Sequence, residues 1–93
     1  MSREAIGDKL IASGILPNLK GFAYIVDAVL DYGPSAPAGM IYTGVAKRNG
    51  TTAARVERGI RHAKGKSEIY KNHTNNEFIA LLRWELRKEG LEL

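Results

Sequence analysis

Apolar residues recur along the chain at the three- and four-residue spacing of amphipathic helices, and strand-like alternation never persists beyond a few residues. This pattern predicts an all-α fold: a compact bundle of five to six helices in one domain, residues 1–93. A single helical turn is expected around Glu68 to Tyr70. Three of the longer helices are predicted over about residues 3–13, 38–48 and 75–90. Between the first two, a further helix is expected to end at Gly33-Pro34, and another is expected to follow Thr52.

Capping residues and apolar stripes predict where these helices begin and which sides are buried. Ser2 and Thr52 are expected N-caps, and Thr74 forms a capping box with Glu77. Gly59 lies in mid-helix, so Gly59→Ala should stabilise the fold unless another helix backbone approaches closely. The residues expected to face the core, with Trp84 at the core or its rim, are Ile6, Leu10, Ile11, Phe22, Ile25, Val26, Val29, Leu30, Met40, Ile41, Val45, Val56, Ile60, Phe78, Leu81, Leu82 and Leu86.

The stretch TTAARVERGIRHA, residues 51–63, predicts a helix with two very different sides. At about 100° per residue, small and apolar residues including Val56 and Ile60 share one side. A solvated surface is the ordinary explanation for the charged side, although a face that reads bases also has a use for a carboxylate among arginines. With the preceding helix and the Asn49-Gly50 turn, the pattern predicts a helix-turn-helix over about 38–64. The charged side gathers Arg55, Glu57, Arg58, Arg61 and His62.

Net charge is concentrated in the same region. Residues 47–73 contain eight basic and two acidic side chains, whereas residues 1–46 contain three basic and four acidic side chains. Such a concentration predicts an anionic partner, most often nucleic acid and less often acidic lipid or protein.

Other functional classes find little support in the sequence. The absence of cysteine excludes disulfides, thiolate metal sites and thiol nucleophiles. His62 and His73 have no third ligand at metal spacing, and catalytic motifs are lacking, so we expect neither an enzyme nor a metal or cofactor. No signal-peptide run or membrane-length apolar stretch occurs, which favours a cytoplasmic, nucleoid-associated protein.

In a helix-turn-helix the second helix enters the major groove of DNA. Arg58 and Arg61 each suit the O6 and N7 acceptors of a guanine, and Glu57 suits the exocyclic amine of a cytosine. His62 lies farther along the same face and could meet a base or a phosphate.

Four segments, in order, resemble the C-terminal DNA-binding effector domain of the stage zero sporulation protein A family: LPNLKGFAYIVDAV, IYTGVAKRNG, GTTAARVERGIRHA and TNNEFIALLRWELR. The resemblance implies a transcription regulator that binds double-stranded DNA at TGTCGAA-type boxes, with RNA polymerase and a second copy on DNA as further partners. It places Glu57, Arg58, Arg61 and His62 toward the bases. The residues it places near the DNA backbone are Thr52, Arg55, Lys47, Arg48 and Lys66.

Two departures from the family pattern bear on function. The chain has no receiver domain, so it is expected to be either a domain cut from a longer protein or a free-standing effector, and the start MSREAIGDKL favours the free-standing form. The segment 64–74 is markedly shorter than the family's, so the family's fifth helix should be reduced to a turn. The alternative hypothesis is a protein-interaction module that modulates a sporulation-type regulator or RNA polymerase without reading specific DNA.

Overall fold

The computed structural model describes residues 2–32 and 38–90. Within them it contains no strand, so the predicted all-α bundle is confirmed. The predicted stop at Gly33-Pro34 lies outside the described residues, and the last residue of the second helix is Asp31. The five helices are α1 (Arg3–Ala12), α2 (Lys20–Asp31), α3 (Ala38–Asn49), α4 (Ala53–Lys64) and α5 (Asn75–Lys88).

All three predicted N-caps are present. The hydroxyl of Ser2 accepts a hydrogen bond from the amide of Ala5 at 3.0 Å, and that of Thr52 accepts one from Arg55 at 3.2 Å. Thr74 and Glu77 form the capping box, with reciprocal bonds of 3.1 and 2.8 Å. The bonds from Thr74 lower the pKa of Glu77 below its ordinary value. These caps fix where α1, α4 and α5 begin.

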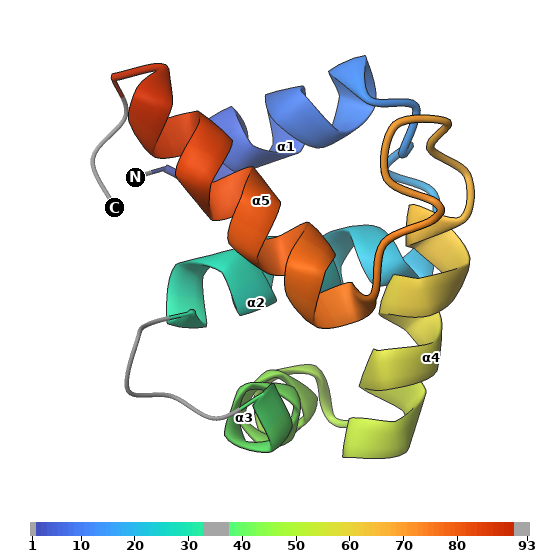
Figure 1. Cartoon of the computed structure of the whole chain (residues 1–93). Coiled ribbons are helices and arrows are strands. Elements are labelled where there is room, and N and C mark those ends of the chain that lie inside the picture. Colours follow the sequence, from blue (N-terminus) through green and yellow to red (C-terminus); the bar gives the residue numbers. More distant parts are fainter. Residues whose placement is uncertain (1, 33–37, 91–93) are drawn as a thin grey trace.

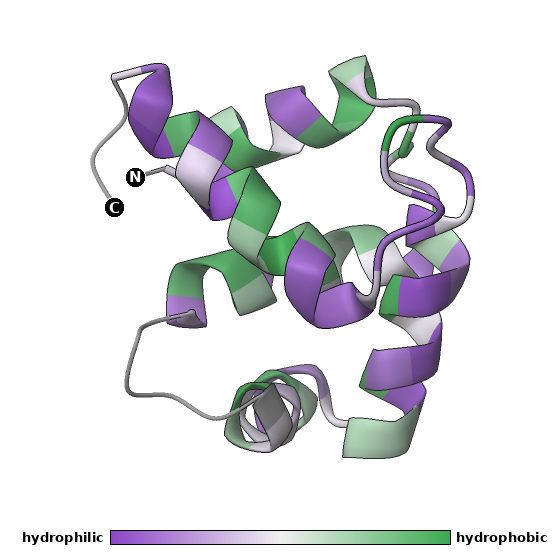
Figure 2. Cartoon of the chain, in the orientation of Figure 1, coloured by the Kyte–Doolittle hydropathy of each residue, from purple (hydrophilic) through white to green (hydrophobic). Residues whose placement is uncertain are grey.

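Helix α2 lies in the middle of the bundle and packs against each of the other four helices (Figure 1). Its sequence explains this position, because it is apolar over most of its circumference, whereas α4 is largely hydrophilic (Figure 2). The buried apolar core draws on all five helices and the links between them: Ile6, Leu10, Ile15, Ile25, Val26, Ala28, Val29, Ile41, Val45, Ala46, Val56, Ile60, Ala63, Tyr70, Phe78, Ile79, Leu82 and Leu86.

Two residues expected in the core are instead exposed. Ile11 is 45% exposed and Met40 is 69% exposed. Each lies one position beside a buried line, and one position rotates a side chain by about 100° around the helix. Phe22, Leu30 and Leu81 are only partly buried. Trp84, expected at the core or its rim, is instead 59% exposed and is not among the residues packed against the core.

Between α4 and α5, the segment 65–74 forms a turn rather than a helix, as its shortness predicts. The amide of Lys71 donates to the carbonyl of Ser67 at 2.9 Å, which closes the turn. Tyr70, which sequence analysis did not assign to the core, is only 3% exposed and packs on Phe78 with ring centroids 5.0 Å apart. Its hydroxyl donates to Glu85 at 2.7 Å. Burial, followed by this hydrogen bond, raises the pKa of Tyr70.

The backbones of α2 and α4 touch where two glycines meet. A Cβ atom added to Gly21 would lie 2.1 Å from the carbonyl oxygen of Gly59 and 2.7 Å from the Cβ of Ala63. A Cβ on Gly59 would lie 2.9 Å from the ring of Tyr24. The nearest backbone atom, the Cα of Gly21, would lie 3.7 Å from this Cβ, which is an ordinary contact. The close approach at Gly59 therefore comes from the Tyr24 ring, which would have to shift, and this offsets the expected benefit of Gly59→Ala.

Gly21→Ala should lower the free energy of unfolding by about 1–3 kcal/mol or more, because the new methyl group would overlap a backbone atom that cannot rotate away. Gly39→Ala is the matched control, since a Cβ there meets nothing within 4 Å. That control should be neutral or stabilising by up to about 1 kcal/mol. Thermal unfolding of both variants measures the difference, and equal melting temperatures would contradict the close contact.

Candidate nucleic-acid interface

The charged side of α4 faces outward, as the helical periodicity predicts. Val56, Ile60 and Ala63 are fully buried. The charged side is open to solvent: its exposed residues are Arg55, Arg58, Arg61 and His62, and Glu57 is partly exposed. Burial of the apolar side therefore leaves three guanidinium groups, one carboxylate and one imidazole on a single outer surface.

Helix α4 is joined to α3 by a three-residue turn and packs directly against it. Figure 1 views α3 almost along its axis while α4 runs up the page, so the two helices lie at a large angle to each other. Gly50 has a φ of +62°, in the left-handed region that favours glycine. The amide of Thr51 donates back to Ala46 at 3.0 Å. This arrangement is consistent with the predicted helix-turn-helix.

A buried carboxylate fastens the turn to the rest of the bundle. Asp27 of α2 is 5% exposed. It accepts hydrogen bonds from Arg3 at 2.6 Å and from the amide group of Asn49 at 2.9 Å. The same amide group donates to the carbonyl of Val45 at 2.8 Å. The C-terminal end of α3 is thus tied to both α2 and α1.

Glu57 and Arg61 form an ion pair one helical turn apart on the exposed face. The guanidinium of Arg61 donates to both carboxylate oxygens of Glu57, and its Nε–H···Oε1 distance is 3.1 Å. The hydrogen bond to Glu57 raises the pKa of Arg61. Arg58 makes only a long contact, 3.5 Å, with the carbonyl of Ala54. Arg61 is therefore restrained before any partner arrives, whereas Arg58 keeps nearly all its donors available.

The five residues predicted to approach a DNA backbone differ in their surroundings. Lys47, Thr52, Arg55 and Lys66 are exposed, although the Thr52 hydroxyl also caps α4. Arg48 is paired with Asp31 of α2, so its charge is neutralised within the protein. Lys64, the last residue of α4, is only 6% exposed, and its ammonium group donates to the carbonyl of His73. Its ammonium group supports the turn rather than the outer surface.

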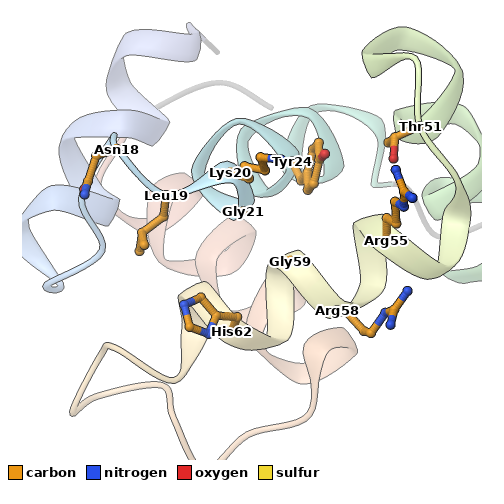
Figure 3. A pocket seen from close by; sticks show the side chains of 10 residues that line it. All are labelled: Asn18, Leu19, Lys20, Gly21, Tyr24, Thr51, Arg55, Arg58, Gly59 and His62. Atoms are coloured by element: carbon orange, nitrogen blue, oxygen red, sulfur yellow. The ribbon is translucent and has the colours of Figure 1, made fainter.

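A groove of about 600 Å³ runs between α4 and the start of α2, and sequence analysis did not identify it (Figure 3). We call it the α2–α4 groove. Its lining combines Arg55, Arg58, Gly59 and His62 of α4 with Thr51 and with the stretch from Asn18 to Gly21 and Tyr24. Lys20 is separated from Arg55 by 35 positions, and no local pattern connects them.

The described residues contain no cluster of three or more His, Cys, Asp or Glu side chains that could hold a metal ion. None of their helices is long and apolar enough to cross a bilayer.

A family model, described as sporulation initiation factor Spo0A C terminal, matches residues 6–68, more than half of the chain. The chain belongs to this family. The match covers α2, α3 and α4 entirely, including every residue of the exposed α4 surface. It ends before α5, so the resemblance of TNNEFIALLRWELR lies outside the matched residues. The family consists of DNA-binding regulatory domains associated with sporulation and is not an enzyme class.

Glu57→Gln should release the guanidinium of Arg61 without unfolding the protein. Loss of the carboxylate should speed hydrogen exchange at Arg61 Nε, which NMR of arginine side chains detects, and Arg58 Nε serves as the internal control. The melting temperature should stay close to that of the parent, because exposed pairs at this spacing contribute little stability. Equally fast exchange at Arg61 in parent and variant would contradict a persistent pair.

Proposed function

We propose that this protein is a sequence-specific, double-stranded-DNA-binding transcription regulator related to the sporulation initiation factor, with α4 as its recognition helix. The main supporting observation is the outer surface of α4, on which the paired Glu57 and Arg61 lie beside the available Arg58. An α-helix with its side chains is about 10–12 Å across, which suits the major groove of B-DNA at about 12 Å. Its helix-turn-helix comprises α3, the turn and α4, residues 38–64.

In this proposal the ion pair prepares Arg61 for base reading. A guanidinium held in one orientation loses less conformational entropy when it meets the O6 and N7 acceptors of guanine. Glu57 remains at its side to accept from a cytosine amine. A box of the TGTCGAA type contains a C-G step, which presents both a cytosine amine and guanine acceptors. Arg58 contacts a second guanine, and His62 meets a base or a phosphate.

The remaining partners follow from the same proposal. Lys47, Arg55, Thr52 and Lys66 contact the DNA backbone, and Arg48 does so only if its pair with Asp31 opens. RNA polymerase and a second copy of the chain on DNA are further partners. A regulator of this kind acts in the cytoplasm, at the nucleoid.

A second candidate function is a protein-interaction module that modulates a sporulation-type regulator or RNA polymerase. Its specific support is an exposed apolar hollow on α5, lined by Leu81, Ala80 and Trp84. Trp84 is 59% exposed, with the Lys88 ammonium 5.0 Å from its ring centroid. The DNA-binding proposal is better supported, because protein binding gives no reason to place Glu57 among the α4 arginines.

The protein should bind a duplex containing a TGTCGAA-type box more tightly than a scrambled duplex of the same composition. Affinity for both should fall as salt is added, because the lysines and arginines displace counterions from phosphates. Gel shifts with both duplexes at two salt concentrations measure these effects. Equal affinity for the two duplexes would refute sequence-specific regulation and favour the protein-interaction module.

Arg58→Ala should cost about 1–3 kcal/mol of binding free energy against the box and much less against the scrambled duplex, since a guanine contact is lost. Lys66→Ala is the control: it removes an exposed cation and should weaken binding to both duplexes similarly. Fluorescence anisotropy titrations of both variants on both duplexes give the four affinities. If Arg58→Ala leaves the preference intact, Arg58 does not face the bases.

A further inference from the structure

The outer surface of α4 has two flanks that adjoin different parts of the bundle. Glu57 and Arg61 lie on the flank next to Tyr42 and Asn75, which come from α3 and α5. Arg55 and His62 lie on the other flank, where they line the α2–α4 groove (Figure 3). Arg58 lies between the two flanks. A helix inserted into the major groove along the Arg58 line would therefore place each flank beside a different DNA strand.

The α2–α4 groove contains cations without counterions. Its lining includes Lys20, Arg55 and Arg58 but no aspartate or glutamate. None of these three cations takes part in an ion pair within the described part of the chain. Other cations of the basic region are neutralised internally, as Arg48 is by Asp31 and Arg61 is by Glu57. Like charges gathered along the walls of a groove create a positive potential that favours an anion.

The glycine contact between α2 and α4 explains why Lys20 belongs to this surface. Lys20 is the first residue of α2 and directly precedes Gly21, whose backbone touches Gly59 of α4. Arg55 and His62 are two turns of α4 apart, about 10 Å along its axis. Gly59 lies between them, so the contact brings Lys20 to the same stretch of α4. The first residues of α2 line the groove as well, and the N-terminal end of a helix carries a partial positive charge.

We propose that the α2–α4 groove is the seat of one backbone phosphate of the DNA strand on this flank of α4. Lys20 of α2 holds the phosphodiester together with Arg55 and His62 of α4. A ring N–H of His62, which lines the groove, can donate to a phosphate oxygen, and this proposal therefore makes His62 a backbone contact. This inference rests on the proposed DNA-binding function and adds a residue outside the helix-turn-helix. Because phosphate contacts set orientation without reading sequence, Lys20 fixes how α4 enters the major groove.

Lys20→Gln tests the seat, with Lys20→Arg as the variant that keeps the charge. Lys88→Gln is the matched control, because Lys88 lies in the last turn of α5 and does not line the groove. Anisotropy titrations over a range of salt concentrations give the slope of log affinity against log salt for box and scrambled duplexes. Lys20→Gln should reduce the magnitude of this slope by about one on both duplexes and leave the box preference unchanged. Lys20→Arg and Lys88→Gln should retain the parent slope.

A second measurement locates the phosphate. Duplexes in which one phosphate at a time is replaced by an uncharged methylphosphonate should reveal a position where the parent loses affinity and Lys20→Gln loses none. An unchanged slope for Lys20→Gln, or equal sensitivity of parent and variant at every position, would overturn the phosphate seat. Lack of box preference in the parent would instead refute the proposed function, while the slope on scrambled DNA would still test the seat.

Discussion

The contact between Gly21 and Gly59 sets the geometry on which the rest of the molecule depends. No side chain separates the two backbones here, so a Cβ atom added to Gly21 would lie only 2.1 Å from the carbonyl oxygen of Gly59. The cost of the mid-helix Gly59, about 1 kcal/mol relative to alanine, is accepted at this crossing. In return α4 is held against the central helix of the bundle, with its apolar side buried and its charged side outward. The start of α2 is brought to the edge of that charged surface.

Ion pairing inside the protein divides its cations into two groups. Asp31 and Glu57 neutralise Arg48 and Arg61, and buried Lys64 supports the turn before α5. Lys20, Arg55 and Arg58 have no such partner among the described residues and surround a common groove. The formal net charge of residues 47–73 therefore overstates how many of their cations are available to a partner. It also does not show that the available cations lie around the α2–α4 groove. For binding DNA, the unpaired group supplies attraction and orientation, while the paired Arg61 supplies a restrained donor.

The segment 65–74 closes the bundle with a short turn between α4 and α5. Tyr70 places an aromatic ring on Phe78 and a hydroxyl on Glu85. Lys64 secures the end of the segment through the carbonyl of His73. These contacts join α4 and α5 with few residues, and Tyr70 is part of the buried core beside them.

Much of the fold could be predicted from the sequence, because helices are specified locally. The caps at Ser2, Thr52 and Thr74 and the buried positions Val56 and Ile60 agree with the structure. The outward side of α4 followed from the same periodicity. Predictions were wrong at the edges of the stripes, at Ile11 and Met40, because one position of rotation separates the core from solvent.

Tertiary structure alone determined which distant residues share a surface. The sequence located the cations of residues 47–73, but it did not show which of them are paired within the protein. The partner of Arg48, for example, is Asp31 on another helix. The sequence could not reveal that Gly59 contacts Gly21, because a glycine in one helix does not show which residue of another helix packs against it. For the same reason the place of Lys20 beside Arg55 and His62 was unpredictable. Periodicity gives the direction of each side chain around its own helix axis, whereas packing between helices sets the distances between axes, and the groove is formed by those distances.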